Sequence, residues 1–285
     1  MKTLVVGATG FIGSAFLRQD LKDNIEIVTR HKNLDCKKYK THVGDLNDKD
    51  FLKHLTRQKF EKIIDLAWEG LPNLSKENNK SNLNLHLNLI KTFAKSGTHQ
   101  FDIAGSCLEY GDYIGKASED KLGDGLSDFA ITKLQILNHL KLQQISYRWF
   151  RIFYAYGPGQ HRNSLLVSAY LHAKNNKNLV LINPHSVRDF IFIDDVALAI
   201  SKLTSNPSAN GVYNVGSGSA TKIVQMVSEV YEHFDLEFKS LEFECKENLT
   251  ADISRINQES YWMPRYSIAE GVESFVKWAK TVNLS

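Results

Sequence analysis

The chain begins with an apolar stretch that leads into three glycines spaced three residues apart. Residues 3–6 (Thr-Leu-Val-Val) have the composition of a buried strand, and Gly7, Gly10 and Gly13 follow. Residues 14–21 are amphipathic, which predicts a helix. Glycines placed between a strand and a helix permit a tight turn, close approach of the backbone to a pyrophosphate, and close helix–strand packing. The stretch therefore predicts a dinucleotide-binding site.

The start of this helix is expected to face the phosphates of the dinucleotide, because its first backbone N–H groups have no partner inside the helix. A glycine-rich turn without a ligand is the alternative interpretation. The position of the motif between a strand and a helix favours the ligand. The sequence assigns to the cofactor Gly7, Thr9, Gly10, Phe11, Ile12 and Gly13.

Strand and helix patterns alternate through the first two thirds of the chain. This alternation predicts an α/β fold of the Rossmann type, with a parallel sheet and helices on both faces. The expected strands are residues 4–6, 25–29, 60–66, 101–105 and 146–153, and the expected helices are 48–56, 82–96 and 129–140. Residues 76–80 are polar and are expected to form a solvated segment.

The pattern is less regular beyond residue 157. The sequence predicts helices over 164–175, 195–203, 221–233 and 268–282, and strands over 180–182 and 212–215. We expect residues 1–157 to form mainly an NADP-binding Rossmann domain. Residues 158–285 are expected to form mainly a small C-terminal substrate-binding lobe, with a segment of about 190–215 returning to the first domain.

Composition excludes several classes of protein. The chain has 285 residues, and 35 Lys and Arg residues against 32 Asp and Glu residues give a formal charge of +3. These charges are mixed along the chain, which does not indicate a surface for nucleic acid. No apolar run reaches the length of about eighteen residues that a membrane helix requires. We expect neither nucleic acid nor a membrane as a partner.

The cysteines and histidines indicate no metal site. Cys36, Cys107 and Cys245 are far apart and form no Cys-x-x-Cys pair, which argues against a disulfide framework or a zinc site. The histidines are scattered, and His86 is expected to be a surface or packing residue. The chain starts with a strand and shows no signal-peptide pattern. These features predict a cytoplasmic protein.

The end of the second strand favours NADP(H) over NAD(H). An acidic residue usually follows the second strand of such folds and holds the adenosine ribose. Here Arg30 and Lys32 stand at that place, and positive charge suits a 2′-phosphate. Two basic residues on a solvated loop are the alternative. Asp45 is a candidate contact for the adenine, and Leu46 follows it.

Two later segments carry a specific resemblance to a known family of enzymes. Residues 104–111 read Ala-Gly-Ser-Cys-Leu-Glu-Tyr-Gly, and residues 127–133 read Ser-Asp-Phe-Ala-Ile-Thr-Lys. With the glycine motif and Arg188-Asp189-Phe190, they make the chain resemble an extended short-chain dehydrogenase/reductase, in the epimerase/dehydratase branch that modifies nucleotide sugars. The resemblance covers nearly the whole chain, from residue 3 to about residue 272.

The resemblance implies three catalytic positions. Ser106 would hydrogen-bond the reacting sugar oxygen, and Lys133 would bind the nicotinamide ribose and lower the pKa of a catalytic phenol. The family has a tyrosine four residues before this lysine, but this chain has Phe129. A positioned acid contributes roughly 10²–10⁴-fold to such a reaction, and phenylalanine has no proton to give. Phe129 therefore suggests an impaired form, natural or engineered, unless Tyr110 or Glu109 replaces the phenol.

The resemblance also implies the rest of the site. For the cofactor, these are Leu66, Ala67 and Phe153, with Lys133. For the substrate, they are Trp68, Ser106, Cys107, Tyr154, Asn163 and Arg188, where Arg188 would bind the diphosphate. Family dehydratases carry an Asp-Glu pair after the catalytic hydroxyl, whereas this chain has Cys107 and Leu108, which argues against dehydration.

The segment from Leu66 to Asn73, together with residues 105–111, resembles a narrower group of reductases. It implies NADPH-dependent reduction of the 4-keto group of a nucleoside-diphosphate 4-keto-6-deoxyhexose. A nucleotide-sugar epimerase is one alternative. A non-catalytic protein that binds NADP and a nucleotide sugar is another, and Phe129 supports it. Family members often pair through two helices, so we expect a homodimer.

Overall fold

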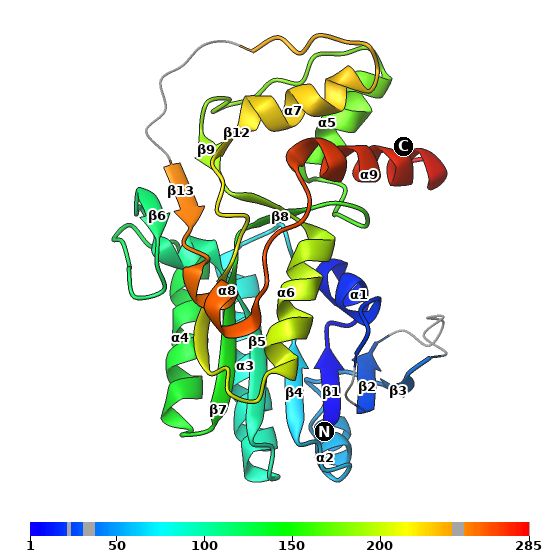
Figure 1. Cartoon of the computed structure of the whole chain (residues 1–285). Coiled ribbons are helices and arrows are strands. Elements are labelled where there is room, and N and C mark those ends of the chain that lie inside the picture. The colour runs from blue at the N-terminus through cyan, green and yellow to red at the C-terminus, as the bar shows by residue number, and fades with distance from the viewer. Residues whose placement is uncertain (22–23, 31–37, 241–247, 285) are drawn as a thin grey trace.

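The computed structural model describes residues 1–21, 24–30, 38–240 and 248–284. Its centre is a sheet of seven parallel strands in the order β11-β7-β5-β4-β1-β2-β3. Figure 1 shows these strands with their carboxyl ends directed towards α5, α7 and α9. The strands are β1 (Lys2–Val6), β2 (Asn24–Thr29), β3 (Lys40–Val43), β4 (Lys62–Asp65), β5 (Gln100–Ser106), β7 (Ser146–Ile152) and β11 (Gly211–Val215).

Consecutive residues of the central strands belong to two different hydrophobic cores, because side chains alternate across a sheet. Leu4, Ile63 and Trp149 pack with α2 (Lys49–Thr56), α3 (Lys76–Lys95) and α4 (Asp128–Leu142). Their neighbours Val5, Ile64 and Phe150 pack with α1 (Phe11–Leu17) and α6 (Ile193–Ser205). The sheet is covered by helices on both faces, and this confirms the predicted Rossmann-type fold.

Most of the remaining elements lie beyond the carboxyl ends of the sheet (Figure 1), and α8 contacts β11, the strand at one edge of the sheet. A four-stranded sheet has the order β12-β9-β13-β6, and β8 pairs with β10. These elements are η1 (Cys107–Tyr110), β6 (Gly115–Ala117), β8 (Tyr154–Tyr156), α5 (Leu165–Lys174), β9 (Val187–Arg188), β10 (Phe190–Phe192), β12 (Thr221–Lys222), α7 (Ile223–Glu232), β13 (Asn248–Ala251), α8 (Ser254–Ser260) and α9 (Ile268–Thr281).

One predicted strand is wrong. Residues 180–182 form no strand, and Val180 and Ile182 are 87% and 89% exposed. A strand requires a partner for its backbone groups. The nearest strand that has such partners is formed by residues 187–188, which pair with β12 and β13.

Two helices begin well before their predicted first residues, and α4 and α6 begin slightly before theirs. The first begins at Phe11 instead of residue 14, directly after Gly10. The third begins at Lys76, so the polar residues 76–80 are its first turn. Lys76, Glu77 and Lys80 are exposed, as expected for a solvated segment, whereas Asn79 is buried. The side chain of Ser75 accepts a hydrogen bond from the backbone N–H of Asn78, which caps this helix.

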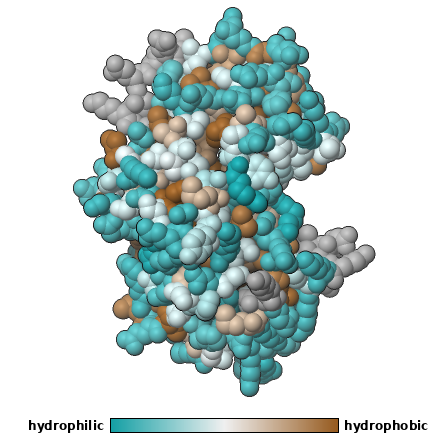
Figure 2. Space-filling view, in the orientation of Figure 1, coloured by the Kyte–Doolittle hydropathy of each residue, from teal (hydrophilic) through white to brown (hydrophobic). Residues whose placement is uncertain are grey.

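The described residues show no apolar helix of the length that crossing a bilayer requires. Figure 2 shows apolar residues scattered among hydrophilic ones on the face in view. On this face, the apolar side chains gather in no continuous band.

A buried ion pair joins two neighbouring strands of the large sheet. Nη1 of Arg148 on β7 lies 2.8 Å from Oδ1 of Asp102 on β5, and both side chains are almost fully buried. Nη2 of Arg148 also donates to the carbonyl oxygen of Asn206, at 2.6 Å. Burial raises the pKa of Asp102 against the lowering effect of Arg148. Each charge therefore depends on the other.

We expect Arg148→Met to lower the free energy of unfolding by about 3–5 kcal/mol, because it leaves the Asp102 carboxylate buried without its partner. Urea unfolding followed by circular dichroism measures this loss. The double variant Arg148→Met with Asp102→Leu is the control, and it should recover much of the stability. Equal losses in the single and the double variant would contradict this account.

Candidate active site

A cavity of about 760 Å³ lies at the carboxyl ends of β1, β2, β4 and β5. It collects residues from turns that are far apart in the sequence. Those predicted for the cofactor that line it are Gly7, Thr9, Gly10, Phe11, Ile12, Arg30, Asp45, Leu46, Leu66, Ala67, Lys133 and Phe153. Those predicted for the substrate that line it are Trp68, Ser106 and Asn163. Lys32 lies outside the described residues.

The glycine turn has no room for side chains. Gly7 has a φ of +75°, and a Cβ there would lie 2.6 Å from the backbone nitrogen of Ala67. A Cβ on Gly13 would lie 2.1 Å from the carbonyl oxygen of Gly7, so Gly13 packs beneath the turn and does not line the cavity. The bare backbone of Gly7 and Gly10 faces the cavity. This cradle fits a dinucleotide pyrophosphate.

An ion pair lies beside the turn. Nη1 of Arg30, which follows β2, is 2.8 Å from Oε1 of Glu69, which follows β4. Both residues line the cavity. Asp45 also lines it, and its carboxylate accepts hydrogen bonds from the backbone and the side chain of Asn47. The sequence predicted Arg30 for the cofactor, whereas Glu69, within the segment 66–73, was given no role.

The chemistry segment lines the same cavity through Ser106 on β5 and through Phe129 and Lys133 on α4. A capping box fixes Ser106: its N–H donates to Oε1 of Glu109 at 2.7 Å, and its Oγ accepts from the N–H of Leu108 at 3.2 Å. Its hydroxyl hydrogen remains able to donate to a ligand. Phe129 presents only a ring.

The ammonium group of Lys133 is held in an aromatic setting. Its Nζ donates to the carbonyl oxygen of Ala104 at 2.7 Å and lies 4.0 Å from the ring centroid of Trp68. The ring of Phe129 is 5.9 Å away. Burial lowers the pKa of Lys133 to about 8, although Asp65 and Glu109 act in the opposite direction. The lysine is therefore poised to change its charge near neutral pH.

A buried pair supports Trp68. The indole stacks on the imidazole of His86, with ring centroids 5.5 Å apart, and Nδ1 of His86 lies 2.6 Å from Oδ2 of Asp65. The ring of Phe129 is nearly perpendicular to the same indole, with ring centroids 5.0 Å apart. His86 is a buried packing residue, which was one of its two expected roles. A signal for the pair was available, because Asp65 is a carboxylate at the end of a buried strand.

Two groups considered as replacements for the missing phenol do not line the cavity. Tyr110 is buried, its hydroxyl donates to Oδ1 of Asn214 at 2.6 Å, and burial raises its pKa to about 12. The carboxylate of Glu109 is buried and accepts hydrogen bonds from Trp149 and Arg151. Glu109 accepts a hydrogen bond from the N–H of Ser106, and Tyr110 packs in the buried cluster next to it.

Three residues predicted for the substrate lie elsewhere. Cys107 is buried with Tyr110 and Phe153, and burial raises its pKa to about 12. Tyr154 lies against Arg188, whose guanidinium carbon is 5.3 Å from the ring centroid. None of Cys107, Tyr154 and Arg188 lines the large cavity.

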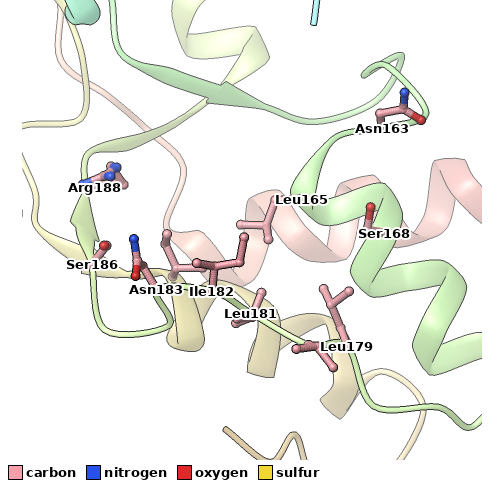
Figure 3. Close-up of a pocket in the computed structure, with 11 residues that line it drawn as sticks. Asn163, Leu165, Ser168, Leu179, Leu181, Ile182, Asn183, Ser186 and Arg188 are labelled. Carbon is pink, nitrogen blue, oxygen red and sulfur yellow. The ribbon is translucent and has the colours of Figure 1, made fainter. Parts of the chain in front are cut away.

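Arg188 lines a second pocket of about 410 Å³. Figure 3 shows Arg188, Ser186 and Asn183 at one side, with Leu165, Leu179, Leu181 and Ile182 along the apolar part. Asn163 lines both pockets, so the second pocket lies next to the large cavity. A polar end and an apolar wall suit a ligand with a charged and a flat part. Among the described residues, no group of three or more His, Cys, Asp or Glu side chains could hold a metal ion.

The sequence pattern that defines the NAD dependent epimerase/dehydratase family matches residues 3–216. The chain belongs to this family. It is 23% identical to the ADP-L-glycero-D-manno-heptose-6-epimerase of Brachyspira hyodysenteriae, with 96% of each chain covered. The resemblance predicted from the sequence is confirmed at the level of the family.

Solved structures share the fold over almost the whole chain. The UDP-glucose 4-epimerase of Thermotoga maritima with UDP-glucose has a TM-score of 0.86 at 19% identity, with coverage of 99% of this chain and 100% of that chain. A tyrosine-to-phenylalanine variant of the UDP-glucuronic acid 4-epimerase of Bacillus cereus, with a fluorinated UDP-sugar and NAD, has a TM-score of 0.85 at 22% identity, with the same coverage.

We expect Lys133→Met to raise the free energy of unfolding at about pH 7, by about 1–3 kcal/mol. Below its lowered pKa, Lys133 is charged in both states, and the folded state bears the cost of burying that charge. Between about pH 8 and about pH 10.4 the folded protein has lost this proton while the unfolded chain still holds it, so wild-type stability rises relative to the variant. Urea unfolding of both proteins at about pH 7 and about pH 10 measures the gap, which is the difference in free energy of unfolding between the variant and wild type. A gap that does not narrow would contradict this account.

Proposed function

We propose that this protein interconverts epimers of a nucleoside-diphosphate sugar through a transient ketone, with a bound pyridine dinucleotide. The observation that carries this proposal is the set of groups around Ser106 in the large cavity. Ser106 and Lys133 offer a hydroxyl and an ammonium group, whereas Cys107 and Leu108 offer no carboxylate. Such a set suits reversible oxidation of a carbinol carbon and does not suit elimination of water.

The relatives support the class of substrate. The heptose epimerase carries ADP in its name, and both solved epimerases are described with UDP-sugars. They match 96% and 99% of this chain, which places most or all of the residues that line both pockets within the matched region. We propose a nucleoside-diphosphate sugar that extends from the large cavity, past Asn163, to Arg188 in the second pocket.

The dinucleotide would be held along the large cavity. The bare backbone of Gly7 and Gly10 would receive the pyrophosphate, and Asp45 would lie near the adenine. Arg30 would bind a 2′-phosphate, because a guanidinium fork matches phosphate oxygens. We therefore propose NADP(H) as the preferred cofactor. The remaining proposed contacts are Thr9, Phe11, Ile12, Leu46, Leu66, Ala67, Lys133 and Phe153, with Gly13 packing beneath the turn.

The residues of the chain would divide the work as follows. A bound pyridine dinucleotide supplies reversible hydride transfer at a carbinol carbon. Ser106 would donate its hydroxyl hydrogen to the sugar oxygen and stabilise the charge that develops there. Lys133 would hold the cofactor ribose with its ammonium group, and Trp68 would cover that ammonium from water. Arg188, beside Tyr154, would bind the diphosphate and fix the sugar at Ser106.

Phe129 leaves the proton transfer without its usual group. The ring stands one helical turn from Lys133 and lines the cavity, which is where the family resemblance puts a phenol. Any proton must therefore reach the sugar oxygen from another donor. Slow turnover is the expected consequence, since a positioned acid contributes roughly 10²–10⁴-fold.

A 4-ketoreductase acting on a nucleoside-diphosphate 4-keto-6-deoxyhexose is the second candidate. Arg30 favours it, because NADPH supplies reducing power for net reduction and the guanidinium faces the cofactor cavity. The two reactions need the same groups around Ser106. They differ in whether the cofactor is consumed.

We also propose the division into a cofactor domain (1–157) and a substrate lobe (158–285), with about 190–215 returning to the first. β11 lies at the edge of the large sheet, consistent with this return. A homodimer through α3 and α4 is our proposal for assembly. These two helices pack side by side, and Leu142 on α4 exposes 77% of its surface.

Phe129→Tyr is expected to raise turnover by about 10²–10⁴-fold, because it restores a phenol beside Lys133. Wild type and variant are incubated with NADP⁺ or NAD⁺ and UDP-glucose, UDP-glucuronic acid or ADP-heptose, and NMR detects the epimer. A second arm follows NADPH oxidation with nucleotide-linked 4-keto-6-deoxyhexoses. Epimer formation without net change in cofactor supports the epimerase.

The other outcomes each decide the function. Net NADPH oxidation would replace the epimerase with the ketoreductase. Equal turnover of wild type and variant would mean that another group moves the proton. Dinucleotide binding without turnover in either protein would leave a non-catalytic binding protein.

In the Phe129→Tyr background, Ser106→Ala is expected to lower turnover by about 10²–10³-fold, since it removes a donor to the developing oxyanion. Ser118→Ala, on an exposed segment with its hydroxyl on Asp120, is the matched control and should leave turnover unchanged. Full activity of the Ser106→Ala variant would exclude Ser106 from the reaction.

A further inference from the structure

The ion pair between Arg30 and Glu69 spans the glycine turn. β1 lies between β2 and β4 in the sheet, Arg30 follows β2, and Glu69 follows β4. The contact of 2.8 Å therefore joins residues on either side of the strand that leads into Gly7. Both residues line the large cavity. The pair stands where the adenosine half of a dinucleotide would pass.

Glu69 is held in place by its backbone. Its N–H donates to Oδ1 of Asn82 at 2.9 Å, and its carbonyl oxygen accepts from Nδ2 of Asn82 at 3.0 Å. Asn82 is buried on α3. Two main-chain hydrogen bonds to a buried side chain keep the carboxylate within reach of Arg30. The side chain can be replaced without disturbing these bonds.

We propose that Glu69 is a specificity-determining residue, an internal competitor of the cofactor 2′-phosphate for Arg30. This inference rests on the proposed binding of a pyridine dinucleotide. A 2′-phosphate reaching Arg30 must either displace the carboxylate or lie beside its negative charge, and both weaken binding. A dinucleotide with a free 2′-hydroxyl meets no such opposition, because a hydroxyl can donate to a carboxylate.

The pair thus supplies two opposite recognition groups at one place. Arg30 favours the phosphorylated ribose. Glu69 would accept a hydrogen bond from a ribose hydroxyl, as an acidic residue at the end of β2 usually does. The side chains of Arg30 and Glu69 are 58% and 36% exposed. Water screens such a pair, so the effect of Glu69 on affinity is modest. The protein is expected to bind both NADPH and NADH, and Glu69 is expected to reduce its preference for NADPH.

The test compares NADPH and NADH, which differ only in the 2′-phosphate. Affinities are measured from nicotinamide fluorescence for wild type, Glu69→Gln and Arg30→Ala. Glu69→Gln should tighten NADPH binding about two- to five-fold and leave NADH unchanged or weaker. Arg30→Ala should weaken NADPH binding about ten-fold or more and leave NADH within about two-fold.

Two controls separate selectivity from general effects. Glu273→Gln removes a carboxylate of a surface ion pair on α9 that does not line the cavity, and both affinities should stay unchanged. Adenosine 2′,5′-bisphosphate and adenosine 5′-monophosphate, as competitors of NADPH, repeat the comparison without the nicotinamide. Equal thermal melting of wild type and Glu69→Gln verifies that the fold is intact.

The outcomes distinguish this inference from the function on which it rests. If wild type binds neither NADPH nor NADH, the proposed function fails and this inference fails with it. If both bind but Glu69→Gln leaves their ratio unchanged, the role of Glu69 is overturned while the cofactor stands. If Glu69→Gln weakens NADPH binding, Glu69 supports Arg30 and does not compete for it.

Discussion

The whole site depends on one contact between two backbones at the carboxyl end of β1. Gly7 comes so close to Ala67 that any Cβ would overlap the backbone after β4, and a Cβ on Gly13 would overlap the backbone of Gly7 even more closely. This contact sets how near α1 lies to the sheet. It also leaves peptide groups, and not side chains, on the cavity wall. The bare backbone on this part of the cavity wall and the close packing of α1 are thus consequences of the same missing atoms.

Most of the fold could be predicted because its signals are local. β1 (Lys2–Val6) ends in the apolar run Leu4–Val6, and buried parallel strands have that composition. The small strands could not be predicted in this way. β6 and β9 have two or three residues each and owe their conformation to partners far along the chain. The apolar residues 180–182 gave a false signal for the same reason, since a strand needs a neighbour as well as a composition.

The large cavity could be predicted from motifs, but its connections could not. Gly7, Ser106 and Lys133 were found because their spacing carries meaning, and all three line the cavity. Glu69 lies in the segment 66–73, which gave it no role of its own, and His86 stands in no motif. Their contacts with Arg30 and Asp65, on other elements, appear only in the structure. Pairs of this kind become visible only in the folded structure, because their two residues lie on different elements. Arg188 lies in a second pocket, which the sequence alone did not separate from the first.

The pairing of β6 with β13 has a consequence for how the protein forms. Residues 115–117 pair with residues 249–251. β6 is therefore synthesised well before the strand with which it pairs. On a ribosome, the sheet from β1 to β7 can assemble first, while β6 keeps an open edge. Contacts so distant in sequence slow folding and leave such edges exposed to other chains. The small sheet can therefore close only after β13 has been made, later than strands β1 to β7 of the large sheet.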